Sequence, residues 1–360
     1  EQVKERLMRY ARINTESDPH STSVPTTSCQ HDLASVIYEE LQEIGATNVY
    51  YDKDTCVVYG SLEANVKTGR AIGFVTHMDT APDASGKDVK PWVLENYDGN
   101  DIILNKEKNI IMSPSVFPNL KQYIGQDLIL TDGTTLLGGD DKASIAAVMT
   151  LLEYLVKHPE IKHNFISVAF TPDEEVSGLA KNLDLERFKS PIAYTLDGDH
   201  LGYYMDETFN ASLSTIEIHG ISVHTATAKG IMKNAVDIGN AFLNKLPALE
   251  KPQYTQGREG FYHVVSFNGD CEYAKIEINV RDHDSLQFDI RNNTLKMIVD
   301  MLNKEYGQGT VNITQRIQYR NLKEVIDQVP FMIPYLKQAI ESVGLTPQTE
   351  PFRGGTDGSA

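Results

Sequence analysis

The run KASIAAVMTLLEYLVK at 142–157, followed by FISVAF at 165–170, decides the fold class of this chain. The first run has the length and apolar spacing of a buried helix, and the second is a short apolar run typical of a strand. Further short apolar runs lie at 55–59, 71–76, 127–131 and 192–196. Helical spacing recurs at 33–44 and predicts a helix that ends at Gly45. Apolar strands separated by helices are typical of a sheet covered on both faces, so we predict an α/β layered domain.

From about residue 210 the pattern changes to alternation of polar and apolar residues, seen at 212–219 and 275–280. Such alternation indicates strands with one face in water. Helical segments near 231–246 and 285–304 separate the strands, and a last strand is expected at 310–314. The resulting order of strand, helix, strand, strand, helix, strand predicts a split βαβ (ferredoxin-like) domain.

The chain after about residue 320 returns to a helix, a strand and a Gly-rich turn that would complete the first domain. We therefore expect the split βαβ domain to be an insertion. The predicted boundaries are 1–208 for the first part of the α/β domain, 209–320 for the insertion and 321–360 for the remaining part of the α/β domain.

The overall charge excludes nucleic acid as a partner. The 360 residues contain 33 Lys and Arg against 50 Asp and Glu, a formal net charge of −17, whereas binding to phosphate backbones requires basic patches. No run approaches the roughly 18 apolar residues that a membrane-spanning helix requires, and the N-terminal residues contain no apolar core of a secretory signal. Cys29, Cys56 and Cys271 form no CxxC pair, which favours reduced thiols. We expect a cytoplasmic protein without membrane or nucleic-acid partners.

The acidic residues gather in three short segments, 131–142, 171–180 and 195–208, which together hold ten acids and one lysine. Each segment follows a predicted buried strand, and ligands in open α/β sheets bind outside the carboxyl ends of the strands. Carboxylates brought together there repel one another unless a cation neutralises them. The clustering therefore points to a cation site.

His77 and Asp79 follow directly on the apolar run at 71–76. Residues two apart on a strand point to the same face, so one of the pair can bind a metal while the other fixes the imidazole tautomer. A His and an Asp at a strand end also make ordinary local hydrogen bonds, and the pair alone does not decide between the two interpretations.

Three acidic motifs complete the candidate site, and they are Gly139-Asp140-Asp141, Asp173-Glu174-Glu175 and Asp197. Each has an ordinary alternative, respectively a helix N-cap, a solvated loop and an acid at a strand end. Taken together with His77, however, they place one imidazole and several carboxylates in one crevice, a ligand set that suits zinc or manganese. Two metals bridged by a carboxylate would activate a water for hydrolysis.

Five motifs, in this order and spacing, resemble those of the peptidase T family, the tripeptide aminopeptidase branch of the dinuclear-zinc aminoacylase and carboxypeptidase superfamily. They are His77-Met78-Asp79, Gly139-Asp140-Asp141-Lys142, Asp173-Glu174-Glu175, Leu196-Asp197-Gly198 and Arg353-Gly354-Gly355-Thr356-Asp357-Gly358. The resemblance covers essentially the whole chain. It implies a zinc-exopeptidase α/β/α catalytic domain with an inserted lid and dimerisation domain, and hence a homodimer.

The resemblance also implies the metal ligands. His77 and Asp197 would hold one zinc ion, Glu175 would hold the other, and Asp140 would bridge them. Asp79 would orient His77. The expected cofactor is two Zn²⁺ per subunit. The chain stops at Ala360, before the family's Gly-rich segment whose His completes the second zinc site, so we expect a truncated catalytic domain and an incomplete second site.

The remaining implied roles concern catalysis and substrate binding. Glu174 would take a proton from a water that bridges the two zinc ions and pass it to the leaving amine. His224 would polarise the scissile carbonyl. Arg281 and Arg353 would bind the terminal carboxylate of the peptide, and Asn234 would also reach the substrate. Without the resemblance, we would interpret His224 as a surface histidine, Arg281 as half of a salt bridge and Arg353 as a turn residue.

We expect a cytoplasmic zinc aminopeptidase of peptide catabolism that removes the N-terminal residue from short peptides, tripeptides in particular. A first alternative is a related zinc deacylase, carboxypeptidase or dipeptidase, because the lid loops decide which end of the peptide is recognised. A second alternative is a non-catalytic, metal-dependent peptide-binding protein.

Overall fold

The computed structural model describes residues 2–176, 179–198 and 200–359. The chain divides into two compact units by its internal contacts. Unit 1 comprises the residues up to Asp197 together with Thr356–Gly358, and unit 2 comprises Gly198–Gly355 together with Ser359. In the predicted organisation, by contrast, 321–360 rejoin the first domain, and those domain boundaries stay a prediction.

Unit 1 is built on a five-stranded sheet with the order β1-β2-β8-β3-β9. The strands are β1 (Thr47–Asp52), β2 (Val57–Leu62), β3 (Ile72–His77), β8 (Ile166–Thr171) and β9 (Ala193–Thr195). β3 runs parallel to both β8 and β9, whereas the β1–β2 hairpin adds antiparallel strands. The carboxyl ends of β3, β8 and β9 therefore meet at one edge of the sheet.

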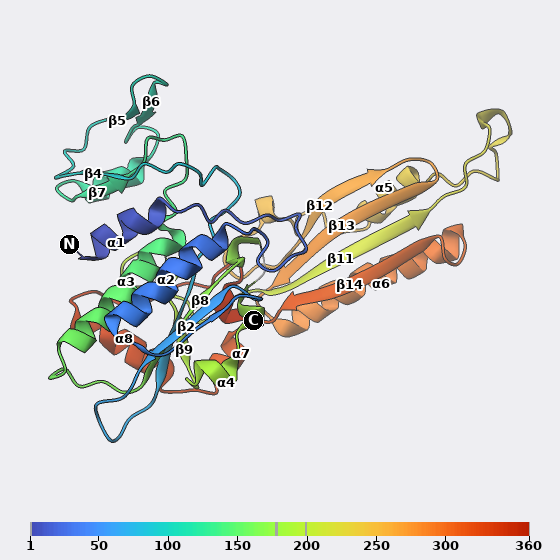
Figure 1. The fold of residues 1–360 in the computed structure, drawn as a ribbon. Helices are drawn as coiled ribbons and strands as arrows, with labels where there is room; N and C mark the ends of the chain where they lie inside the picture. Colours follow the sequence, from blue (N-terminus) through green and yellow to red (C-terminus); the bar gives the residue numbers. More distant parts are fainter. Residues whose placement is uncertain (1, 177–178, 199, 360) are drawn as a thin grey trace. The chain divides into compact units, whose positions relative to one another are not determined.

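Helices cover this sheet on both faces, as the sequence predicted. They are α1 (Gln2–Ala11), α2 (Gln30–Ile44), α3 (Gly139–Lys157) and α4 (Leu185–Phe188). α1, α2 and α3 lie side by side (Figure 1) and share one buried core with β2 and β8. α2 ends at Gly45, which has a φ of 87°, as predicted from the sequence. α4 covers the other face through Phe188, and Gly73 of β3 makes room for it, because a Cβ there would lie 2.2 Å from the Phe188 ring.

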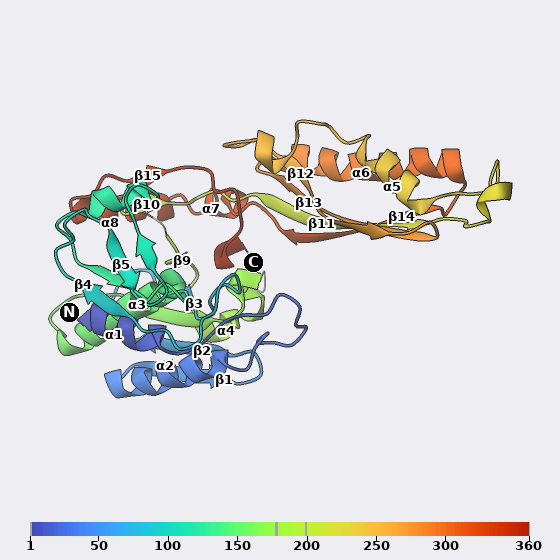
Figure 2. The same ribbon diagram turned by 90° about the horizontal axis from the view of Figure 1, so that it is seen from above.

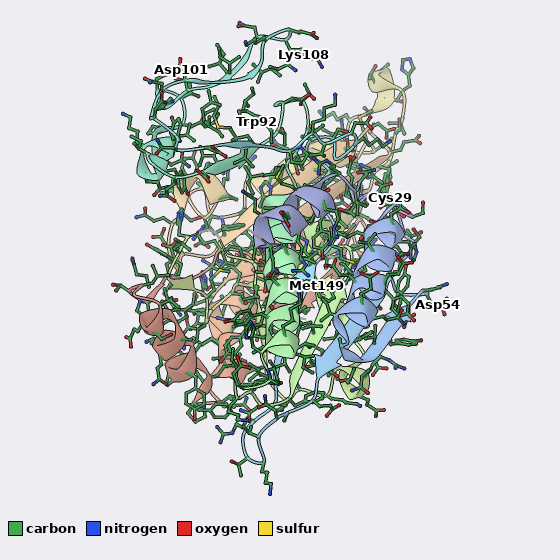
Figure 3. All side chains as sticks on the ribbon, turned by 60° about the vertical axis from the view of Figure 1, so that its left-hand side comes forward. Cys29, Asp54, Trp92, Asp101, Lys108 and Met149 are labelled. Atoms are coloured by element: carbon green, nitrogen blue, oxygen red, sulfur yellow. The ribbon has the colours of Figure 1, made fainter. Side chains whose placement is uncertain are left out.

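Residues 80–136, between β3 and α3, form a small separate substructure. The predicted strand at 127–131 is β7 (Leu128–Leu130), but it pairs with β4 (Trp92–Leu94) and lies outside the main sheet. A second pair is β5 (Ile102–Asn105) with β6 (Ile110–Met112). This substructure has its own core, and Trp92 lies well apart from Met149 of the α3 core (Figure 3).

Unit 2 contains the predicted split βαβ arrangement. Its four-stranded antiparallel sheet has the order β12-β13-β11-β14. The elements are β11 (Asn210–His219), α5 (Ala235–Leu243), β12 (Phe261–Gly269), β13 (Tyr273–Asp282), α6 (Ser285–Tyr306) and β14 (Val311–Tyr319). α5 and α6 lie along one face of the sheet (Figure 2), and the burial along β11 alternates on its second half as predicted.

The rest of unit 2 consists of short elements. They are β10 (Tyr203–Tyr204), which pairs in parallel with β15 (Gln348–Thr349), and the helices α7 (Lys323–Ile326) and α8 (Met332–Ser342). Among the helices that the structure describes, none combines the length and apolar character needed to cross a membrane.

Candidate functional site

His77, the last residue of β3, lies at the centre of the site. Its side chain is 1% exposed, and its Nε2 lies 3.0 Å from Oδ1 of Asp140. Its Nδ1 lies 3.3 Å from Oδ1 of Asp79. The main-chain N–H of His77 donates a hydrogen bond to Oδ2 of Asp141 at 3.2 Å. Carboxylates therefore contact both ring nitrogens of one buried imidazole.

Asp140 and Asp141 reach His77 because of the turn that begins α3. Gly138, which precedes the helix, has a φ of 73°, in the left-handed region that favours glycine. Asp140 and Asp141 themselves do not have helical dihedral angles. The regular helix therefore begins after them, and their side chains project from the turn. Asp140 is exposed and Asp141 is buried.

The turn after β8 carries Glu174 and Glu175, the first two residues of the 3₁₀ helix η2 (Glu174–Val176). The buried carboxylate of Asp79 accepts the main-chain N–H of both residues, at 2.9 Å from Glu174 and 3.2 Å from Glu175. Asp79 thus contacts the imidazole of His77 and also fixes the main chain of the acidic turn.

Three overlapping groups of side chains in the described part of the chain offer ligand atoms within 4.8 Å of one another. They are His77, Glu174 and Asp197; His77, Asp140 and Glu175; and Asp140, Asp141 and Asp197. The structure therefore brings together the four predicted metal ligands and Glu174, while Asp79 lies directly against His77. Which side chain binds which ion stays a prediction.

Burial shifts the pKa values of the acids strongly. It raises the pKa of Glu174 to about 8, that of Asp141 to about 8 and that of Glu175 to about 7. Burial also raises the pKa of Asp197. Each raised pKa shows that a negative charge at that position is costly without a neighbouring cation.

The imidazole supplies positive charge to this cluster. Burial lowers the pKa of His77, but its hydrogen bonds with Asp140 and Asp79 outweigh burial, so the pKa is raised well above the ordinary value. The hydrogen bond with His77 in turn lowers the pKa of Asp140. A set of one imidazole and several oxygen donors, with excess negative charge, fits divalent cations such as zinc or manganese.

Sequence reasoning missed further residues beside this cluster. Thr171, at the end of β8, donates a hydrogen bond to Oδ2 of Asp357 at 2.5 Å. Oδ1 of Asp357 is buried without a hydrogen-bond partner among the described residues, and burial raises the pKa of Asp357 to about 6. The only sequence signal for Asp357 was its place in the Gly-rich motif at 353–358.

Lys142 and Asp141 lie in a predicted motif, but the sequence assigned neither of them a role in the site. Lys142 is 2% exposed and donates from Nζ to the carbonyl oxygen of Ile13 at 2.8 Å. Burial lowers the pKa of its ammonium to about 8. A lysine in the first turn of a helix is usually exposed, so the sequence held no signal for this burial. For Asp141 the only signal was its position next to Asp140.

His224, a predicted catalytic residue, and Asn234, a predicted substrate-binding residue, lie in unit 2. His224 is exposed, and its Nδ1 accepts the main-chain N–H of Ala226 at 3.1 Å. Asn234 is the N-cap of α5, where its Oδ1 accepts the main-chain N–H of Val236 at 2.9 Å. Both side chains are therefore oriented by their own main chain.

The two predicted substrate arginines, Arg281 and Arg353, also lie in unit 2. Nη1 of Arg281 donates to Oε1 of Gln318 at 2.7 Å, and in the described part of the chain Arg281 forms no ion pair with a carboxylate. Burial lowers its pKa.

Arg353 uses its guanidinium differently. Its Nη1 donates to the carbonyl oxygens of Gly257 and Glu259, each at 2.8 Å, and its Nη2 donates to Oγ1 of Thr255 at 2.8 Å. Its Cζ lies 5.1 Å from the ring centroid of Phe209 and 5.4 Å from that of Phe261. Arg353 therefore ties down the loop at 255–259.

A curated peptidase T from Alkaliphilus oremlandii (strain OhILAs) is 47% identical to this chain over 358 residues, which cover 99% of the chain and 87% of that protein. The chain belongs to the peptidase T family. It is a peptidase, and its residues 207–310 match the family described as peptidase dimerisation domain. This match falls on the split βαβ part of unit 2.

Solved structures show the same peptidase T fold. The aminopeptidase PepT from Bacillus cereus ATCC 10987 has a TM-score of 0.75 and 22% identity, covering 99% of this chain and 86% of that one. A tripeptidase from Staphylococcus aureus subsp. aureus mu50 has a TM-score of 0.76 and 20% identity, with the same coverage of 99% and 86%. The predicted combination of an α/β domain with an inserted split βαβ domain is confirmed.

Proposed function

We propose that this member of the peptidase T family is a metal-dependent aminopeptidase that removes the N-terminal residue of tripeptides. The observation that carries the proposal is the cluster of His77, Asp140, Glu175 and Asp197 with Glu174 beside them, at the carboxyl ends of β3, β8 and β9. The names of the similar proteins, peptidase T and tripeptidase, support the choice of substrate.

We propose zinc as the metal, with two ions per subunit. His77 and Asp197 would hold one ion, Glu175 the other, and Asp140 both, since Asp140 shares one group of close ligand atoms with Glu175 and another with Asp197. Bound there, the ions would neutralise the carboxylates, polarise the scissile carbonyl and lower the pKa of the attacking water.

Glu174 is the proposed proton carrier. Asp79 fixes its main chain, and burial raises the pKa of its carboxyl group to about 8. Nearby cations would lower this pKa toward neutrality, where a carboxylate is well suited to take a proton from water and return it to the leaving amine.

His224 is proposed to donate a hydrogen bond to the scissile carbonyl. Because its Nδ1 accepts the N–H of Ala226, the neutral imidazole carries its proton on Nε2. The exposed edge of the ring is thus a donor, which suits stabilisation of an oxygen that gains negative charge.

Arg281 is the proposed partner of the peptide's terminal carboxylate, because it forms no ion pair among the described residues, and a guanidinium is a bidentate donor for carboxylates. Arg353 has fewer donors left for substrate, and we propose that it supports this function through the loop at 255–259. Oδ1 of Asn234 is engaged in the helix cap, so any contact of Asn234 with substrate would use its Nδ2.

We further propose a homodimer, supported by the dimerisation domain matched at 207–310. The domain boundaries after 208 and after 320 belong to the same proposal. We propose a cytoplasmic location, supported by three cysteines that are all free thiols.

The substrate proposal is tested with two peptides, Leu-Gly-Gly and its N-acetylated form. We expect release of free leucine from Leu-Gly-Gly and resistance of the acetylated peptide. Rapid deacetylation of the acetylated peptide would favour the deacylase alternative, and release of C-terminal glycine would favour a carboxypeptidase. Binding of metal and peptide without cleavage would contradict the proposed function.

A further inference from the structure

The acidic turn Asp173–Glu175, which carries the proposed proton carrier, is fixed from two sides. On one side the carboxylate of Asp79 accepts the main-chain N–H groups of Glu174 and Glu175. On the other side the turn is attached through the side chain of Asp173, which belongs to none of the three groups of close ligand atoms. The proposed mechanism gives this second attachment no role.

Asp173 is 4% exposed, and its carboxylate accepts hydrogen bonds from three donors of a segment far away in the sequence. Thr26 donates its main-chain N–H at 2.9 Å and its Oγ1 hydroxyl at 2.6 Å. Gln30, which is fully buried at the start of α2, donates from Nε2 at 2.7 Å. The main-chain N–H of Asp173 returns a hydrogen bond to Oε1 of Gln30 at 3.3 Å.

The backbone at Asp173 requires this support. Its φ is 64°, in the left-handed region, which is unfavourable for a residue with a Cβ. Such a conformation persists where surrounding contacts impose it. Because Asp173 directly precedes Glu174, its dihedral angles set the direction in which the main chain leaves β8 and carries both glutamates toward His77.

We propose that Asp173 is a positioning residue, which holds Glu174 and Glu175 in place through Thr26 and Gln30. This inference rests on the proposed function of the two glutamates. The contact between Asp173 and Gln30 also links the start of α2 to the acidic turn, so the segment at 26–30 forms part of the support of the site.

The chemistry of the contact suggests a test by exchange of donor and acceptor. In Asp173→Asn, an amide N–H₂ replaces one acceptor oxygen and faces the N–H₂ of Gln30 or the donors of Thr26. In Gln30→Glu, two carboxylates face each other. In the double variant, the carboxylate introduced at position 30 offers one oxygen to the new amide and one to the main-chain N–H of residue 173. Each single change should therefore impair the site, and the double change should restore it.

The experiment measures kcat and KM for Leu-Gly-Gly, and separately Co²⁺ affinity from the visible absorption of the protein during titration. For Asp173→Asn we expect Co²⁺ affinity and kcat each to fall by ~10- to 100-fold, as for other residues that orient metal ligands. We expect KM to change little. In the double variant Asp173→Asn/Gln30→Glu, we expect Co²⁺ affinity and kcat to recover.

The matched control is Glu40→Gln, which removes charge from a buried, hydrogen-bonded acid on the helical side of unit 1. It should lower Tm and leave kcat and Co²⁺ affinity unchanged. If Asp173→Asn behaves like this control, or if the double variant shows no recovery, the inference is wrong. Co²⁺ absorption requires no turnover, so a wild-type protein that cleaves no tripeptide would contradict the proposed function while the titration still tests Asp173.

Discussion

At the scale of single residues, Asp79 has two roles in one carboxylate. It contacts Nδ1 of His77 at 3.3 Å and accepts the N–H groups of Glu174 and Glu175. The orientation of the imidazole and the position of the proton carrier are therefore coupled through one fully buried acid. Loss of Asp79 is expected to disturb both, so its substitution cannot isolate either role.

Arg281 allows a sharper prediction at this scale. Arg281→Lys keeps the positive charge but loses the bidentate donor geometry that fits a carboxylate. We expect KM for Leu-Gly-Gly to rise by ~10-fold, the value of one lost charge-assisted hydrogen bond. The amide Leu-Gly-Gly-NH₂ lacks the carboxylate, so its KM should be the same for the wild type and for Arg281→Lys. Steady-state kinetics with both peptides tests this, and an equal rise in KM for the two would refute the carboxylate assignment.

The candidate residues that the sequence indicates are those at recognisable positions relative to a predicted strand or turn. His77 and Asp79 lie two apart at the end of a strand, and Asp140 and Asp197 follow directly on predicted turns or strands. The support of Asp173 was not predictable, because Thr26 and Gln30 lie 147 and 143 positions away from it. The burial of Lys142 depends likewise on the carbonyl group of Ile13, 129 positions away.

At the scale of elements, polar contacts join α1, α2 and α3 at the surface of their common core. Glu40 of α2 accepts hydrogen bonds from Arg6 at 2.7 Å, from Arg9 at 2.6 Å and from the hydroxyl of Tyr10 at 2.6 Å. Arg6 also contacts Glu153 of α3. One acid thus receives three donors of α1, and one arginine extends the network to α3.

Glu40→Ala should destabilise unit 1 strongly. Removal of the acid takes its partner from the buried hydroxyl of Tyr10 and one of two carboxylates from Arg6, which keeps Glu153. Loss of such buried hydrogen bonds costs about 1–3 kcal/mol. The neighbouring Glu39 is exposed, so Glu39→Ala serves as the control and should change the free energy of unfolding by less than about 0.5 kcal/mol. Urea unfolding followed by circular dichroism measures both. Equal effects of the two changes would show that the network adds no stability.

The elements of the α/β domain were predictable from apolar runs and from caps such as Gly45, but their pairing was not. The run that forms β7 has the composition of a strand in the main sheet, yet it pairs with β4 in the separate substructure of 80–136. Apolar composition decides that a segment is a strand, whereas the partner of that strand is decided by the residues that surround it in the folded chain.

At the scale of the whole molecule, the net charge of −17 is distributed unevenly, because several acids gather around His77. Burial raises the pKa values of Glu174, Asp141 and Glu175 to about 8, 8 and 7, far above the ordinary values of about 4 in the unfolded chain. Through these three acids, the folded, metal-free protein therefore binds more protons than the unfolded chain between about pH 4 and pH 8.

The stability that these acids contribute is present below the unfolded pKa and is lost as pH rises through the folded pKa values. His77, whose pKa is also raised, acts in the same direction. We expect Tm of the metal-stripped protein to fall from about pH 5 to about pH 8, and zinc added at the higher pH to restore it. The control is calorimetry of the triple variant Asp141→Asn/Glu174→Gln/Glu175→Gln, whose Tm should fall less steeply with pH. If the Tm of the triple variant falls as steeply with pH as that of the wild type, these three acids do not cause the pH dependence.

Glu174 is the proposed proton carrier, and hydrolysis at the proposed metal centre depends on its carboxylate. The decisive measurement is kcat for Leu-Gly-Gly in metal-loaded wild type and in Glu174→Gln, with bound zinc determined in both. Glutamine keeps the size of the side chain but carries no exchangeable carboxyl proton, so we predict equal zinc content and a fall in kcat of ~10²- to 10⁴-fold. Equal kcat values at equal zinc content would contradict the mechanism.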